Sequence, residues 1–136
     1  MGTTLVVLSG LAQLGLVVVG TQVPRVMRWG PELARLGTAN RRLVWVYGAF
    51  IAGANLGFGT LSILHAEELA RGEGLAGGFA LFLAVYWAAR LAVQLLLFRG
   101  PGWPEEARRP LVAAGFALLF AAMIAVYATA FAGGFR

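Results

Sequence analysis

Residues 75–98 read LAGGFALFLAVYWAARLAVQLLLF, an apolar run in which Arg90 is the single charged residue. As an α-helix rising about 1.5 Å per residue, this run is long enough to cross the roughly 30 Å hydrocarbon core of a bilayer. Three further runs of similar length contain no charged residue, and these are Thr4–Val23, Leu43–Leu64 and Leu111–Phe135. The sequence therefore predicts an all-α integral membrane four-helix bundle that forms a single transmembrane domain, residues 1–136.

The composition is typical of a membrane protein and not of a soluble domain or a nucleic-acid-binding protein. Apolar residues make up 60% of the chain and charged residues 12%, which leaves more apolar surface than a soluble domain of this size can hide. All eleven positively charged residues are arginines, and most lie at the ends of the runs, where lipid headgroups are expected. The net charge of +5 thus predicts contact with membrane lipids and no nucleic-acid partner.

The distribution of the arginines predicts how the chain crosses the membrane. The connection 25–42 holds five arginines and one glutamate, and the connection 99–110 holds three arginines and two glutamates. The middle connection, 65–74, holds one arginine and three glutamates. Because positively charged loops stay on the cytoplasmic side, we expect connections 25–42 and 99–110 to be cytoplasmic and both termini to face outward, an N-out/C-out topology.

The two arginine-rich connections share a short pattern. Residues 29–35 read WGPELAR, and residues 103–108 read WPEEAR. Each residue has a local reason to be present, since tryptophan anchors at headgroups while proline and glutamate suit the start of a helix. Alternatively, the chain consists of two parallel hairpin repeats related by an axis along the membrane normal. The sequence leaves both interpretations open.

Small residues recur at four-residue spacing in three of the runs, and such residues let lipid-embedded helices approach closely. The positions are Ala49, Gly53 and Gly57 in the second run, Ala80, Ala84, Ala88 and Ala92 in the third, and Ala113, Ala117, Ala121, Ala125 and Thr129 in the fourth. These stripes predict close helix contacts, either within the chain or with another subunit of a homo-oligomer or larger membrane complex. Four helices can satisfy the stripes internally, and internal contact is the first expectation.

Arg90 is the one ionisable residue deep in a run, and no run contains a carboxylate to pair with it. Counted by helical rise, Gln13 and Asn55 lie within about 6 Å of Arg90 in depth. Tyr86 and Gln94 lie one turn before and after Arg90 on the same helix face. These five residues are the predicted ligand-binding group.

Three roles compete for Arg90. Its long side chain can reach the phosphates of the inner leaflet, or it can serve as a hydrogen-bond hub between helices. As a third role, it can bind an anionic ligand or a lipid headgroup in a cavity.

Few residues of the chain suit catalysis or cofactor binding. The chain has no cysteine, which excludes thiol chemistry and thiolate metal sites, and its one histidine, His65, excludes a bis-histidine haem. His65 and Glu68 share a helix face, but two ligands at an exposed boundary do not make a metal site. We expect no catalytic residue, no metal and no cofactor, because tyrosines and an arginine that stays protonated offer little for acid–base chemistry.

Residues 44–50 (VWVYGAF) and 57–59 (GFG), with residues 86–91 (YWAARL) and Gln94, resemble a group of small bacterial four-span membrane proteins of unknown role. The resemblance covers the second and third runs and implies no particular chemistry, only that Arg90 and Gln94 belong to a recurrent pattern. The overall prediction is a structural or interaction protein, or an accessory subunit, of the bacterial inner membrane. The alternative is a small transporter, a channel or a lipid- or anion-binding protein that uses the polar group around Arg90.

Overall fold

The computed structural model describes residues 1–136, all of whose regular structure is helical. Four helices are long and apolar enough to span a membrane, α1 (Gly2–Gly20), α4 (Thr38–Leu64), α6 (Gly74–Leu96) and α8 (Pro110–Phe131). The prediction of an all-α chain with four membrane-spanning helices is thereby confirmed, and the chain is a multi-pass membrane protein. Helix α4 begins five residues before the apolar run, so that Arg41 and Arg42 extend its polar end.

Four short helices occupy the connections between the long ones. They are α2 (Val23–Val26), α3 (Trp29–Leu33), α5 (Ala66–Arg71) and α7 (Glu105–Arg108). Helix α4 ends at Leu64, and His65, with a φ of −115° and a ψ of 30°, separates it from α5, which runs in a new direction. Pro110 is the first residue of α8, a position that accepts proline because its nitrogen needs no hydrogen-bond partner there.

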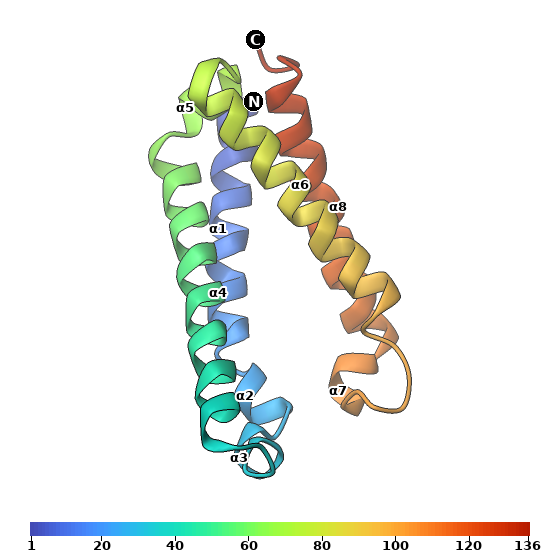
Figure 1. The fold of residues 1–136 in the computed structure, drawn as a ribbon. Helices are drawn as coiled ribbons and strands as arrows, with labels where there is room; N and C mark the ends of the chain where they lie inside the picture. Colours follow the sequence, from blue (N-terminus) through green and yellow to red (C-terminus); the bar gives the residue numbers. More distant parts are fainter.

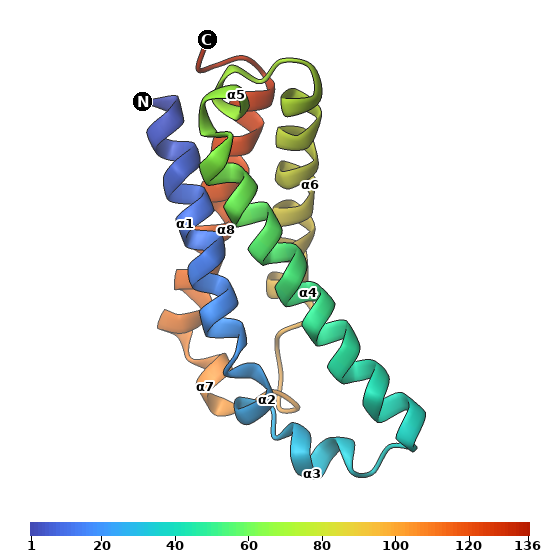
Figure 2. The same cartoon turned by 90° about the vertical axis from the view of Figure 1, so that its left-hand side faces the viewer.

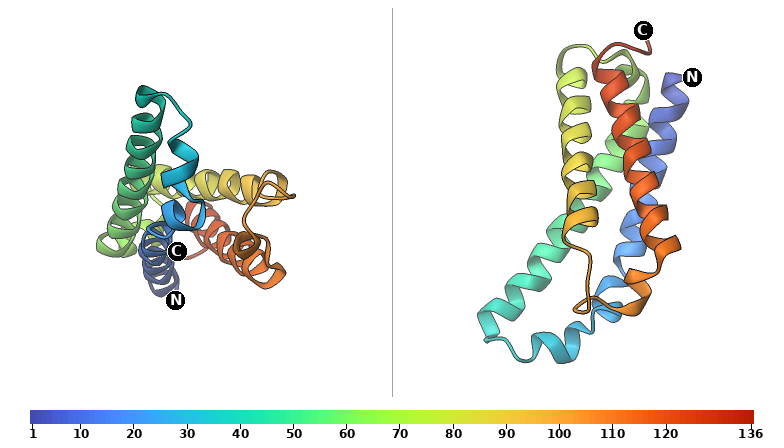
Figure 3. Two further views of the ribbon diagram at one scale, coloured as in Figure 1. Left: turned by 90° about the horizontal axis from the view of Figure 1, so that it is seen from below. Right: turned by 90° about the vertical axis from the view of Figure 1, so that its right-hand side faces the viewer.

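The long helices form two antiparallel hairpins, which we call the α1/α4 arm and the α6/α8 arm (Figure 1). The arms meet at the end that carries α5 and both chain termini, the closed end. They diverge towards the end that carries α2, α3 and α7, the open end (Figures 1 and 2). Seen from the open end, the two arms point in different directions, and the four helices do not form a closed square (Figure 3). The four-helix arrangement is therefore a pair of joined hairpins.

The best-buried side chains lie at the closed end and between α6 and α8. Leu69 of α5 is almost completely buried, and it packs in one cluster with Val6 of α1, Leu83 of α6 and Met123 of α8. The turn between α5 and α6 is tight: Gly72 has a positive φ of 67°, and any Cβ there would overlap the carbonyl oxygen of Ala130. The short helix α5 thus packs between the two arms and joins them.

The close approach of α1 and α4 depends on Gly10 and Gly59, and not on Gly53 and Gly57 of the predicted stripe. A Cβ on Gly10 would lie 2.8 Å from the Gly59 carbonyl oxygen, and a Cβ on Gly59 would lie 2.9 Å from the Gly10 carbonyl oxygen. By contrast, a Cβ on Gly53 or Gly57 would meet nothing within 4 Å. The expectation that the Gly53-x-x-x-Gly57 motif packs internally is wrong, because Gly59 lies about 200° around the helix from Gly57.

The alanine stripe of α6 packs internally over only half its length. Ala80 and Ala84 are buried, whereas Ala88 and Ala92 are exposed. A four-residue spacing advances about 40° further around an α-helix at each step, so the stripe leaves the interface with α8 after two turns. A spacing that alternates three and four residues would have stayed on the contact face.

Candidate functional site

The structure divides the predicted ligand-binding group instead of gathering it around Arg90. Asn55 and Tyr86 contact each other, Gln13 binds a residue outside the predicted group, and Arg90 packs against aromatic rings. Gln94 lines a cavity one turn further along α6. Similar depth in the membrane was thus a poor guide to contact, because it takes no account of how each helix is rotated about its axis.

Gln13, Ser62 and Tyr127 form a buried polar cluster between the two arms. The Gln13 Nε2 donates to the Tyr127 hydroxyl oxygen at 2.5 Å, and the Ser62 and Tyr127 hydroxyl oxygens lie 2.7 Å apart. All three residues are fully buried, and Gln13 also donates to the Ser9 carbonyl oxygen at 3.3 Å. Because α1, α4 and α8 each supply one member, the cluster fastens the α1/α4 arm to α8.

Tyr127 was absent from the predicted site residues, although the sequence carries a signal for it. It is one of two polar side chains in the apolar helix α8, the other being Thr129. A hydroxyl inside a membrane needs an internal partner, since hydrocarbon provides none. That rule predicts a partner for Tyr127 but does not say which residue it is.

Asn55 and Tyr86 make the second polar contact between the arms. The Tyr86 hydroxyl donates to Asn55 Oδ1 at 3.3 Å, and Asn55 Nδ2 donates to the Ile51 carbonyl oxygen at 3.0 Å. The Phe58 ring lies edge-on to Tyr86 and Phe82, with ring centroids 5.2 and 5.4 Å apart. This contact between α4 and α6 is therefore structural in character: one weak hydrogen bond supported by aromatic packing.

Arg90 packs between two phenylalanine rings. Its guanidinium carbon lies 4.7 Å from the ring centroid of Phe98 and 5.1 Å from that of Phe120, within the range of cation–π attraction. The Trp87 ring stacks on Phe120 at 5.3 Å. Arg90 Nη1 and Trp87 Nε1 are both buried, and neither has a hydrogen-bond partner. Arg90 is thus held by one ring just beyond the end of α6 and one on α8, and its buried Nη1 has no partner.

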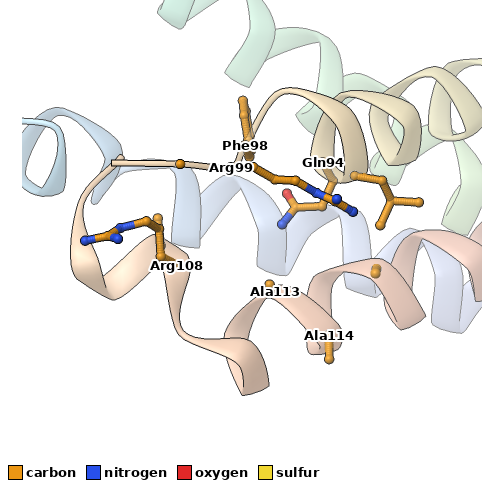
Figure 4. A pocket seen from close by; sticks show the side chains of 10 residues that line it. Gln94, Phe98, Arg99, Arg108, Ala113 and Ala114 are labelled. Atoms are coloured by element: carbon orange, nitrogen blue, oxygen red, sulfur yellow. The ribbon is translucent and has the colours of Figure 1, made fainter. Parts of the chain in front are cut away.

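Gln94 lines a cavity of about 440 Å³ between the end of α6 and the start of α8 (Figure 4). Arg99, just after α6, and Arg108, at the end of α7, line the same cavity, and no carboxylate does. The opposite wall is made of small residues of α8, including Ala113 and Ala117. Of the five predicted residues, Gln94 is the one that borders this space.

Two other cavities lie towards the open end. One, of about 400 Å³, lies between α1 and α4, where the rings of Trp29 and Trp45 meet edge to face with centroids 5.0 Å apart; its lining is mainly apolar but includes Asn55. The other, of about 760 Å³, separates the connections of the two arms and is lined by charges of both signs. Those charges are Arg25, Arg28, Glu32, Glu105 and Glu106.

The acidic group at the closed end is exposed. His65 Nδ1 lies 3.7 Å from a Glu68 carboxylate oxygen, and Arg71 pairs with Glu67 on the same short helix. No three acidic or histidine side chains gather as they would around a metal ion. Ion pairs of this kind at an exposed surface stabilise a fold little.

Comparison of the chain with protein-family models, with curated proteins and with solved structures finds no match. The resemblance of the second and third runs to small bacterial four-span proteins therefore stays a prediction, and the site has to be interpreted from its own geometry.

Proposed function

We propose that this chain is a structural or interaction protein of the bacterial inner membrane, which associates with another membrane-embedded chain. The arginine-rich open end would lie in the cytoplasm, and both termini would lie outside, in line with the charge of the connections. The two connections that share the Trp and Pro-Glu pattern lie at this same end, and each links the two helices of one arm. That arrangement supports a two-hairpin repeat.

The observation that carries the proposal is the uncovered Gly53-x-x-x-Gly57 face of α4. Helix α4 contacts α1 through Gly59 and α6 through Asn55, and open space surrounds Gly53 and Gly57. In a bilayer, apolar side chains gain little from association, whereas a face of small residues lets a second backbone come close. Since no helix of this chain covers the face, we infer that a helix of another subunit does, and a second copy is the simplest candidate.

Disulfide crosslinking tests the proposal directly, because the chain has no cysteine of its own. A Gly53→Cys variant in native membranes is expected to form a covalent dimer on mild oxidation. The matched control is Ala54→Cys, an exposed position about 100° further around the same helix, which should crosslink far less. Equal crosslinking at both positions would show that α4 meets other copies at random. A Gly53 adduct with a different protein would identify the partner as another chain.

A second candidate function is a small transporter, a channel or a lipid- or anion-binding protein that uses Arg90. The unpartnered Nη1 of Arg90 favours it, since a buried guanidinium donor without a partner is costly and a ligand or water would relieve that cost. If this candidate is right, Arg90→Gln abolishes the thermal stabilisation that a phospholipid gives the purified protein. If the protein is only a structural subunit, Arg90→Gln leaves that stabilisation unchanged and leaves the fold intact.

A further inference from the structure

The cavity between α6 and α8 contains polar groups that no internal contact uses. Gln94 is 8% exposed, yet its amide takes part in none of the side-chain hydrogen bonds of the chain. Figure 4 shows the amide pointing into the cavity. Neither polar atom of this amide is sealed off from the cavity, so both are free to bond a ligand or water there.

Arg99 brings an unpaired positive charge to the same cavity. The ion pairs of the chain are His65–Glu68, Arg71–Glu67 and Arg136–Glu73, so Arg99 belongs to none of them. In Figure 4 its guanidinium extends towards Gln94. The two glutamates of the neighbouring helix α7, Glu105 and Glu106, line the separate cavity between the connections. The cavity beside Gln94 therefore carries a net positive charge, because no carboxylate in its lining offsets the arginines.

The loop that forms one wall of the cavity is braced by side chains. The Trp103 indole Nε1 donates to the Leu97 carbonyl oxygen at 3.0 Å, and Arg108 Nε donates to the Trp103 carbonyl oxygen at 2.9 Å. The centroids of the Phe98 and Trp103 rings lie 4.4 Å apart. Arg108 turns its guanidinium away from Gln94, and so it stands at the rim of the cavity (Figure 4). A braced loop loses little conformational entropy when a ligand binds, which favours affinity.

Helix ends add a smaller electrostatic contribution. Ala113 and Ala114 place the first turns of α8 in the wall, and this helix start has neither a side-chain cap nor an acidic residue. The free N–H groups and positive dipole end of a helix attract anions. The end of α6 contributes the opposite sign, but the Trp103 indole already occupies the Leu97 carbonyl. The arginines therefore determine the sign of the electrostatic potential in the cavity, which is positive.

We propose that this cavity binds a phosphate group. Arg99 supplies charge-assisted hydrogen bonds to the phosphate oxygens, and the Gln94 amide donates a further one. The volume, about 440 Å³, suits a headgroup-sized anion and not a whole lipid. The phosphate belongs either to a phospholipid headgroup or to a soluble phosphate compound. The proposal goes beyond the second candidate function, with which it shares only Gln94, because the cavity is lined by Arg99 and not by Arg90.

The test compares Arg99→Gln and Gln94→Leu with Arg109→Gln. Arg109 is exposed on the same connection and does not line the cavity. Its variant is therefore the control, because it removes one positive charge, as Arg99→Gln does, without changing the cavity. Retention of phosphatidylglycerol is measured by native mass spectrometry from an uncharged detergent, with diacylglycerol, which lacks the phosphate, as the reference lipid. Inorganic phosphate is tested separately by thermal unfolding. We expect about a tenfold loss of phosphate binding in Arg99→Gln and Gln94→Leu and none in Arg109→Gln.

The outcomes separate the two sources. Arg99-dependent retention of phosphatidylglycerol identifies a phospholipid headgroup, and stabilisation by inorganic phosphate with no lipid preference identifies a soluble compound. Should Arg99→Gln and Arg109→Gln behave alike with both probes, the site does not exist. A second pair, Ala117→Leu against Ala121→Leu, fills the cavity without removing a charge, since Ala117 lines it and Ala121 is exposed. Binding that survives Ala117→Leu would also overturn the proposal.

Discussion

The hydroxyl oxygen of Ser62 on α4 lies 2.7 Å from that of Tyr127 on α8, in a fully buried environment between the two arms. Because the Tyr127 oxygen also accepts from Gln13, its own proton is free to reach Ser62. One phenol thus connects three of the four membrane-spanning helices, near the end where the arms meet.

Tyr127→Phe is expected to destabilise the protein by about 1 kcal/mol, the scale of hydrogen bonds between helices in membranes. The change removes the oxygen that Gln13 and Ser62 share, so that the buried Ser62 hydroxyl loses its partner and Gln13 keeps only its longer bond to the Ser9 carbonyl oxygen. Unfolding in mixed detergent micelles measures the loss. Tyr47→Phe, which removes an equivalent hydroxyl from a side chain that is 61% exposed, is the control and should change nothing.

Gly59→Ala should weaken the contact between α1 and α4, whereas Gly53→Ala should not. A Cβ at Gly59 would lie 2.9 Å from the Gly10 carbonyl oxygen, and overpacking of this kind costs about 1–3 kcal/mol. A Cβ at Gly53 meets open space, so that variant gains helix propensity without a clash. Monomer unfolding free energies distinguish the two. Equal losses would mean that α1 and α4 do not cross at Gly10 and Gly59.

Gly72→Ala and Gly74→Ala form a pair that separates backbone strain from a steric clash. Both glycines have positive φ, 67° and 53°, so each alanine variant bears about 1 kcal/mol of conformational cost. Only at Gly72 does the added Cβ also overlap the Ala130 carbonyl oxygen of α8. We expect the melting temperature to fall clearly more for Gly72→Ala. The reverse order would place the α5–α6 turn away from α8.

Arg90 and Phe120 should be energetically coupled. In a double-mutant cycle of Arg90→Gln and Phe120→Leu, we expect a coupling free energy of about 0.5–2 kcal/mol from the lost cation–π contact. Arg90→Gln with Leu118→Ala is the reference cycle, because Leu118 is on α8 but 71% exposed. A coupling near zero in both cycles would mean that Arg90 does not rest on the Phe120 ring in the bilayer.

The expected topology can be tested with cysteine variants, since none of the natural residues would react. Arg35→Cys at the open end should react with a membrane-impermeant maleimide only after the inner membrane is opened. Glu67→Cys at the closed end should react in intact spheroplasts. Labelling in the opposite pattern would place the arginine-rich end outside and contradict the charge rule for this chain.

Part of the candidate site follows from sequence reasoning, and part does not. The sequence identified Gln94 and Asn55 as polar groups in apolar helices that need partners. It did not identify Arg99 or Tyr127, because an arginine at a span end and a tyrosine in a span both have ordinary reasons to be there. What distinguishes Tyr127 is a partner from another helix, Gln13, and what distinguishes Arg99 is the cavity that it lines together with Gln94 and small residues of α8.

The sequence by itself determined that the chain has four segments long and apolar enough to cross a membrane as helices, and which residues they comprise, because length and apolarity are properties read along the chain. Only the tertiary structure decided which faces meet. The Gly10–Gly59 crossing, the polar cluster at Tyr127 and the divergence of the two arms depend on how each helix is rotated about its axis. That rotation is set by the packing of side chains far apart in sequence, since in lipid close fit and hydrogen bonding, and not apolarity, determine which helices associate.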